Sequence, residues 1–394
     1  MKHSAIWLLS TILLILCGCA TILEDDMRAE SLHKVTTNER PPEEQVEITD
    51  YSQLITAFLE MVKQHETAAV LVVYRYDGDV QTDVAKAADE IMRNDPITMY
   101  AVAEIAASVN RIVSIFEIDV RIEYKRTREQ VASIVNVSTL RYLRTELMSI
   151  MSEYREEAVF LTSLRITEEE MIAVINDSYY QNPRSIVIMP VTVIEIFSTD
   201  ESDMIIEIRL SNIELPRVLQ QYGESLTRSV RLNALAAEGE NDAEILLSLA
   251  QNLIDASDFD EGTARTISEH GVPNLAATAY SALVRGTAVG EGFAMAFKAL
   301  CDELGFECQI VLGHFNNMVH AWNIVSLYGS YYHVDLAMCA HNGIETAFIK
   351  NDDDFANSYT WDTENTVECN GSLTLDDITI QQIVALSSEP MQGV

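Results

Sequence analysis

His320 and Asp335 occupy matching positions of a predicted hairpin and have the types and spacing needed for proton transfer. Apolar stretches at 321–327 and 331–336 flank a Leu-Tyr-Gly-Ser sequence, which predicts adjacent antiparallel strands joined by a short turn. Either a two- or a four-residue turn leaves both side chains on one face, about 5–8 Å apart. A carboxylate at that distance orients an imidazole, so we expect His320 to be a general base and Asp335 its orienting partner.

A helix expected over 291–304 begins directly after Gly290. Phe293 and Phe297 recur at helical spacing on its apolar face, and Gly305 follows as a left-handed stop. The first turn of a helix carries free N–H groups and the positive end of the helix dipole, which lower a thiol pKa and stabilise an oxyanion. Position 290 therefore suits a reactive thiol, but glycine has no side chain that could attack a carbonyl.

As a set, these features resemble the bacterial transglutaminase-like superfamily, close to its cytokinesis-protein-3-type branch. That family has a Tyr and a Gly before a Val-Cys-x-Gly-Tyr turn, then a His-Ala-Trp-Asn strand and a Tyr-x-Val-Asp strand. The resemblance covers about residues 240–375 and implies a cysteine-protease-like fold in which Gly290 stands in place of the nucleophilic cysteine. The matching residues are Tyr280, Gly286, Val289, Gly292, Phe293, His320, Ala321, Trp322, Asn323, Tyr332, Val334 and Asp335.

The glycine separates three functional hypotheses. The favoured one is a catalytically inactive domain that binds a peptide, protein or cell-wall ligand in a cleft lined by Trp322, Asn323 and Glu291. The alternative is an active cysteine-peptidase or transglutaminase-type acyl-transfer enzyme whose displaced nucleophile is Cys339 or Thr287. The third is a structural surface lipoprotein that acts through its N-terminal modules. We expect no cofactor and no metal, because the histidines lack His-x-His or HExxH spacing.

The N-terminus predicts export and attachment to a membrane. An apolar run over 5–16 is too short to span a bilayer comfortably and fits the core of a signal peptide. The sequence Leu16-Cys17-Gly18-Cys19 resembles a bacterial lipobox, which implies a lipoprotein signal peptide at 1–18 and lipid on Cys19. An ordinary cleaved signal peptide or an uncleaved anchor is the alternative. We expect an extracytoplasmic, lipid-anchored protein with a flexible acidic stalk at 19–48.

Charge and cysteine content bear on partners and compartment. The formal net charge of −35 repels polyphosphates and argues against nucleic acid as a partner. An exported compartment permits disulfides. We expect Cys339 to pair with Cys369, and Cys301 with Cys308 is a second candidate pair; buried free thiols are the alternative for both. The sequence does not indicate an oligomeric state.

The segment 51–212 repeats one order of elements, helix–strand–helix–strand–strand, and a proline follows the middle helix both times. The fold class expected is α+β: a C-terminal transglutaminase core, with a helix packed on an antiparallel sheet, preceded by two small α+β modules. The predicted divisions are modules at 49–130 and 131–215, the core with an N-terminal helical connector at 216–375, and a tail at 376–394. The expected helices are 51–64, 80–93, 138–154 and 167–180, and the expected strands are 68–76, 99–107, 113–124, 158–166, 186–197 and 204–210.

Overall fold

The computed structural model describes residues 48–113, 115–199, 203–270 and 274–379. The predicted signal peptide, the lipid attachment at Cys19 and nearly all of the predicted stalk lie outside these ranges. Helices alternate with mainly antiparallel sheets along the described chain, which confirms the α+β fold class. Within the described residues, no helix combines the length and the apolar character needed to cross a membrane.

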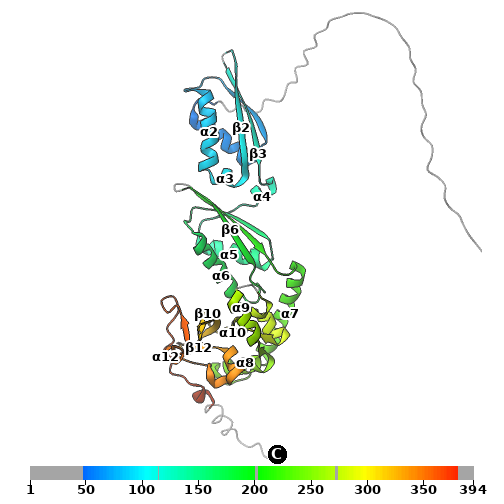
Figure 1. Cartoon of the computed structure of the whole chain (residues 1–394), viewed down its shortest axis with the longest axis vertical. Helices are drawn as coiled ribbons and strands as arrows, with labels where there is room; N and C mark the ends of the chain where they lie inside the picture. The colour runs from blue at the N-terminus through cyan, green and yellow to red at the C-terminus, as the bar shows by residue number, and fades with distance from the viewer. Residues whose placement is uncertain (1–47, 114, 200–202, 271–273, 380–394) are drawn as a thin grey trace, which may run out of the picture. The chain divides into compact units, whose positions relative to one another are not determined.

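The first module has a three-stranded antiparallel sheet in the order β1-β3-β2, with helices packed against it (Figure 1). Asp50 and Asp79 accept hydrogen bonds from first-turn N–H groups and thereby fix where the first two helices begin. The first part of the strand predicted over 99–107 is helical instead, because Asp95 caps a further short helix with Pro96 in its first turn. The elements are α1 (Tyr51–Gln64), β1 (Ala68–Val73), α2 (Val80–Asn94), α3 (Pro96–Ala101), β2 (Val102–Ile112) and β3 (Ile115–Tyr124).

The second module has a four-stranded sheet in the order β4-β5-β7-β6. Its β5-β7-β6 part repeats the order β1-β3-β2, which confirms the internal repeat of elements. The strand predicted over 186–197 is shorter than expected: Ile186, Val187 and Ile188 are buried without being part of a strand, so that apolar run reflects burial and not sheet pairing. The elements are α4 (Arg128–Ala132), β4 (Val135–Val137), α5 (Leu140–Ser152), β5 (Glu157–Thr162), α6 (Glu168–Tyr180), β6 (Val191–Phe197) and β7 (Met204–Ser211).

The second sheet contributes buried residues to two cores, although Val191 and Val193 on its edge strand β6 are exposed. Phe160, Ile206 and Ile208 belong to a large apolar core that continues into the C-terminal part of the chain. Phe197 and Ile205 instead pack with the core of the first module. The second sheet therefore belongs to both cores, which explains why six of the eight residues of β7 are buried.

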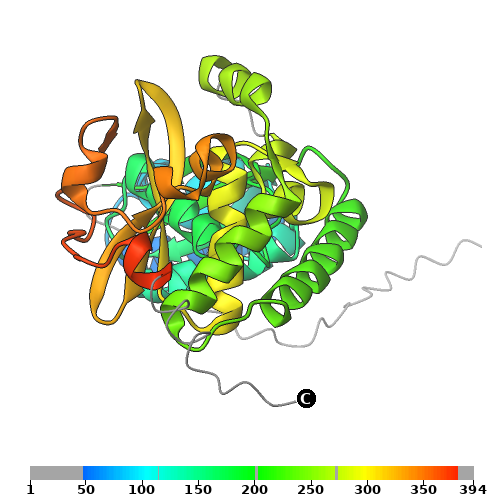
Figure 2. The ribbon, with the colours of Figure 1, turned by 90° about the horizontal axis from the view of Figure 1, so that it is seen from below.

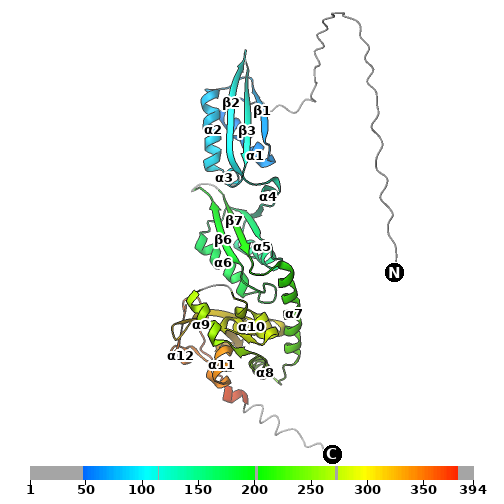
Figure 3. The same cartoon turned by 45° about the vertical axis from the view of Figure 1, so that its right-hand side comes forward.

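The C-terminal part consists of helices packed around a four-stranded sheet in the order β12-β11-β10-β13 (Figures 1 and 3). Central helix α10 packs on β11, and most of its apolar residues, including Phe293 and Phe297, are buried, whereas Leu304 at its end is exposed. Tyr328 and Gly329, both with positive φ, form the two-residue turn between β11 and β12. The elements are α7 (Pro216–Leu235), α8 (Asp242–Ala256), β8 (Asp258–Phe259), α9 (Glu261–His270), η1 (Leu275–Ala277), η2 (Ser281–Arg285), β9 (Thr287–Ala288), α10 (Gly290–Leu304), β10 (Cys308–Phe315), β11 (Met318–Leu327), β12 (Ser330–Val334), α11 (Leu336–Asn342), η3 (Ile344–Thr346), α12 (Asp352–Phe355) and β13 (Tyr359–Trp361).

Candidate functional site

His320 on β11 and Asp335 at the end of β12 are in direct contact. Nε2 of His320 lies 2.7 Å from Oδ2 of Asp335, and the carboxylate is 1% exposed. The two-residue hairpin turn produces this contact, as the alternation of side chains predicts. Asp335 is also the N-cap of α11, where its Oδ1 accepts from the backbone N–H of Met338. Tyr359 on β13 donates its hydroxyl to Oδ2 of Asp335 over 2.8 Å, so the orienting carboxylate is itself held from two further sides.

The imidazole of His320 lies directly against Gly290, the first residue of α10. A Cβ added to Gly290 would lie 2.6 Å from Nδ1 of the ring, 3.3 Å from Nε2, and closer still to Cε1. Real Cβ atoms do not approach neighbours so closely, and therefore only glycine fits beside the ring in its present position. The side of the ring that carries Nδ1 thus faces the start of the helix, while Nε2 faces Asp335.

The start of α10 supplies N–H groups at the same place. Val289 is the N-cap residue, and no side chain caps this helix. The first N–H groups of a helix have no acceptor within the helix, so those of the Gly290 turn can bind an oxygen atom of a ligand. In this arrangement a thiol at the helix start would complete a nucleophile–base–carboxylate triad, and a glycine is the residue present.

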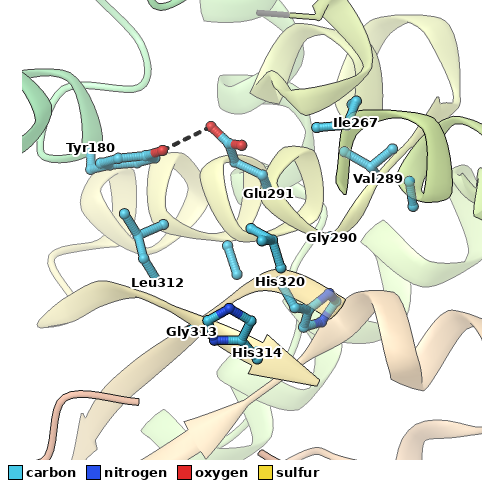
Figure 4. A pocket seen from close by; sticks show the side chains of 12 residues that line it. Tyr180, Ile267, Val289, Gly290, Glu291, Leu312, Gly313, His314 and His320 are labelled. Carbon is cyan, nitrogen blue, oxygen red and sulfur yellow. Dashed lines mark hydrogen bonds between the residues drawn. The ribbon is translucent and has the colours of Figure 1, made fainter. Parts of the chain in front are cut away.

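Two hollows meet at His320. One, of about 320 Å³, lies between the start of α10 and strands β10 and β11, and contains Glu291 and His314 in its wall (Figure 4). The other, of about 260 Å³, lies between α9, α11 and the β10–β11 turn. Ala264, Val319 and His320 line both hollows. Viewed from below, α9 stands apart from the neighbouring helices on the side of the β10–β11 hairpin (Figure 2). The two hollows form one cleft with the imidazole at its midpoint.

Glu291 lines the cleft, as predicted, and has an unusual environment. Burial raises the pKa of its carboxyl from 4.5 to about 7, and a hydrogen bond from Tyr180 partly offsets that rise. The hydroxyl of Tyr180 donates to Oε1 of Glu291 over 3.1 Å (Figure 4). Tyr180 is the last residue of α6, in the second module. The sequence does not reveal Tyr180, because no local pattern indicates that the second module meets the C-terminal part at this position.

Trp322 and Asn323 do not line the cleft, so that prediction is wrong. Each is 1% exposed. Asn323 points toward the opposite side of β11, where its amide donates to the carbonyl of Ala294 on α10 over 3.0 Å. Trp322 packs among the rings of Phe355 and Tyr359, beneath the imidazole of His320. Both residues therefore support the site from the interior of the protein.

Among the described residues, His333, Asp352 and Cys369 form one cluster of potential metal ligands, with ligand atoms within 4.8 Å of one another. The hydrogen bonds oppose ligation. The indole N–H of Trp322, which can only donate, points at Nδ1 of His333 over 3.0 Å. The ring proton must then sit on Nε2, which faces Asp352 over 2.8 Å. A metal on Nε2 would move the proton to Nδ1, where it would face the indole N–H. These residues therefore fit a chain of hydrogen bonds from Trp322 through His333 to Asp352, and not a metal site.

The four cysteines of the described residues are free and buried, so the predicted disulfides, Cys339 with Cys369 and Cys301 with Cys308, are wrong. The thiol of Cys339 donates to the carbonyl of Ile344, and that of Cys369 points toward the carbonyl of Val367. Burial raises the pKa of both thiols to about 12. Cys339 is therefore a protonated core residue.

Thr287, the other substitute considered for the nucleophile, lies in β9. Its backbone pairs with Asp258 of β8, and its carbonyl accepts a hydrogen bond from the hydroxyl of Ser281. The described hydrogen-bond partners of the His320 ring do not include Thr287. Thr287 is therefore close to Gly290 in sequence, but it has no described contact with His320, the candidate base.

Known proteins offer limited similarity. Neither a family model nor a curated protein matches the sequence. Similar solved structures include a transglutaminase (TGase), 10% identical over 55% of this chain and 60% of that chain, with a TM-score of 0.27. A protein from Cytophaga hutchinsonii assigned as a cysteine protease is 15% identical over 38% of this chain and 63% of that chain, with a TM-score of 0.23. A protein from Parabacteroides distasonis assigned as a protease is 8% identical over 68% of this chain and 43% of that chain, with a TM-score of 0.21.

The chain thus covers less than two thirds of each of these three proteins. All three TM-scores lie below 0.5, so the functional interpretation rests on the geometry of the site in this chain.

Proposed function

We propose that this chain is a catalytically inactive, transglutaminase-like binding protein that holds an extended peptide, a protein segment or a cell-wall peptide in the cleft around His320. The observation that carries the proposal is the packing of the His320 ring against Gly290. The base and its orienting carboxylate are in contact, yet the residue facing the base has no side chain. Covalent acyl transfer requires a nucleophile within reach of the base, and neither Cys339 nor Thr287 has a described contact with the ring.

The shape of the cleft supports an extended ligand. The hollows lie on either side of the imidazole, so a chain that crosses His320 would occupy both. The larger hollow offers Glu291, His314 and the N–H groups of the Gly290 turn as hydrogen-bonding partners. The smaller hollow offers apolar surface from Phe315 and Met318 together with the polar residues Arg265 and His341. A ligand that carries both polar and apolar groups on each side of His320 would match these surfaces.

In this proposal, His320 contacts the ligand, the buried Asp335 holds the His320 ring in place, and neither residue catalyses a reaction. The buried carboxylate holds the imidazole in one orientation, with its Nδ1 side at the start of α10. Retention of the dyad gives the ligand a defined hydrogen-bonding group in the middle of the cleft, because the ring is oriented before the ligand arrives.

Tethering belongs to the same proposal and is supported by the sequence pattern at Cys19. A lipid on that residue would keep the cleft outside the cytoplasmic membrane, where peptide and cell-wall ligands are accessible. Mass spectrometry of the purified protein should find a diacylglyceryl group on Cys19, and Cys19→Ser should release the protein from membranes. A soluble wild-type protein with an unmodified Cys19 would contradict this part.

The main experiment separates binding from turnover. A panel of muropeptides and glutamine-containing peptides is titrated against the wild type, Ala264→Trp and Thr266→Trp. Ala264 lines both hollows, whereas Thr266 is an exposed residue on the same helix and serves as the matched control. We expect binding by the wild type and Thr266→Trp, and loss of about tenfold or more in affinity for Ala264→Trp.

Acyl transfer from the same glutamine peptides to a fluorescent primary amine is measured in parallel. We expect the wild type to give only the background rate, and His320→Ala to give the same rate. If the wild type turns over substrate and His320→Ala abolishes that turnover, the chain is an enzyme with a displaced nucleophile, and the proposal fails.

A further inference from the structure

A second groove lies far from the cleft in sequence, between α2 and β2 of the first module. It has a volume of about 530 Å³. Helix α2 contributes Ala85, Ala88, Asp89 and Met92, and β2 contributes residues 103–107. Figure 3 shows α2 running alongside β2. Most of these side chains are small, so the groove leaves room for side chains from another chain.

The strand beside this groove is a sheet edge. In the order β1-β3-β2, strand β2 pairs with β3 on one side, and within the described residues it has no strand on the other. It is 11 residues long. Natural edge strands are usually protected by lysine, proline or short length. Strand β2 contains neither lysine nor proline, and its one register irregularity lies at its beginning, between Val102 and Glu104. Most of its length therefore offers backbone groups to an added strand.

The two faces of β2 differ in polarity, and this difference indicates which side chains an added strand should carry on each face. Ile105, Ala107 and Val109 face inward and pack against the core of the first module. A strand added at this edge would direct alternate side chains toward these residues and toward the alanines of α2. The inward positions of the ligand must therefore be apolar and small enough for the groove.

The outward face is acidic. Glu104 lies directly opposite Glu123 in the register between β2 and β3, an unfavourable pairing of like charges. Further along β3, Asp119 and Glu117 lie opposite Ser108 and Asn110, and Arg121, opposite Ala106, offsets only part of this negative charge. A basic side chain on the outward positions of an added strand would lie next to Glu104 and relieve its repulsion from Glu123. A second copy of this chain is the less suitable occupant, because each copy carries a net charge of −35.

We propose that the groove between α2 and β2 binds an extended segment of a partner protein by strand addition to β2, and that this segment alternates small apolar and basic residues. This site is independent of the cleft at His320 and goes beyond the binding function proposed for it.

The test uses the complete chain and a fluorescein-labelled peptide of five Lys-Val repeats. Two peptides serve as comparators: five Glu-Val repeats reverse the charge, and five Lys-Pro repeats keep the charge but cannot pair as a strand. We expect the Lys-Val peptide to bind about tenfold or more tightly than either comparator. Amide hydrogen exchange should slow across 102–112 when it binds.

Variants locate the binding site. Ala85→Trp fills the groove from an exposed position of α2, and Gln81→Trp introduces the same side chain at another exposed position of that helix, outside the groove. We expect the first to weaken binding of the Lys-Val peptide about tenfold or more and the second to leave it unchanged. Glu104→Lys should also weaken that binding, and it keeps the proposal testable if Ala85→Trp does not fold.

Several results would overturn the proposal. If the Lys-Pro peptide binds as tightly as the Lys-Val peptide, binding depends on charge alone and not on strand addition. Protection that appears at β6 or around His320, and not at β2, would place the peptide elsewhere. Protection of β2 that rises with protein concentration in the absence of peptide would identify a second copy as the occupant.

Discussion

Replacing Gly290 by alanine tests whether the His320 ring is packed against the start of α10. The added Cβ would lie 2.6 Å from Nδ1, whereas ordinary van der Waals contact begins at 3.4 Å. The ring must therefore withdraw by about 1 Å. It is held by the 2.7 Å hydrogen bond to Asp335, and that carboxylate is in turn fixed by Tyr359 and by the backbone of α11. Withdrawal stretches or breaks the bond to Asp335.

Two effects of opposite sign determine the result. Loss of a hydrogen bond to a charged group costs about 1.5–3 kcal/mol. Alanine is favoured over glycine within a helix by about 0.5–1 kcal/mol. Gly290→Ala should therefore lower the free energy of unfolding by about 1–2 kcal/mol. In a His320→Ala background the clash is absent, so the same substitution should raise the free energy of unfolding by up to about 1 kcal/mol.

The predicted change of sign is the decisive measurement. Urea unfolding can be followed by tryptophan fluorescence, because Trp322 and Trp361 lie in contact with each other next to the site. The four proteins of this double-mutant cycle should give a coupling of about 1.5–3 kcal/mol between positions 290 and 320. Equal effects of Gly290→Ala in both backgrounds would refute the packing argument, and stabilisation of the wild type by Gly290→Ala would do so as well.

Three further predictions concern groups around the site. Burial raises the pKa of Glu291 from 4.5 to about 7, so between these pH values the native carboxyl keeps a proton that the unfolded chain releases. The stabilising contribution of this carboxyl is therefore complete below pH 4.5 and is lost as the pH rises through about 7. Glu291→Gln should flatten that part of a plot of melting temperature against pH, and an unchanged plot would contradict the assignment. Tyr359→Phe should lower the free energy of unfolding by about 1–2 kcal/mol, because the buried Asp335 loses one donor; denaturant titration checks this, with Tyr331→Phe, an exposed donor to Glu307, as the control. Cys301, Cys308, Cys339 and Cys369 are buried and free, so iodoacetamide should label none of them in the folded protein and all of them in urea without reductant; incomplete labelling in urea, detected by peptide mass mapping, would indicate a disulfide.

The contact between His320 and Asp335 was predictable because it depends on local rules. A two-residue turn fixes the register of a hairpin, and register fixes which side chains share a face. The start of α10 was predictable for a similar reason, since apolar spacing and Gly305 mark both ends of the helix. The repeated order of elements in the two modules followed from apolar runs separated by polar turns.

The predictions that failed depend on tertiary packing. Trp322 has the same strand parity as His320, but parity does not reveal that β13 and α12 cover the indole. Tyr180 reaches Glu291 from a position 111 residues away in the chain, and no sequence pattern encodes that contact. The disulfide predictions used compartment and loop position, whereas Cys339 and Cys369 have different hydrogen-bond partners and Cys301 interacts with Cys308 as a free thiol. The buried run at 186–190 was taken for a strand because apolar composition alone does not distinguish sheet pairing from core filling.

The second sheet contributes residues to two cores, and this has a consequence for whether the modules can fold separately. Here Phe197 and Ile205 complete the first core, and Phe160 and Ile206 belong to the second. Removal of either neighbour would expose an apolar sheet face to water. The repeated order of elements therefore does not make the two modules independent folding units, because each module, cut from the chain, would lack residues that bury its apolar side chains.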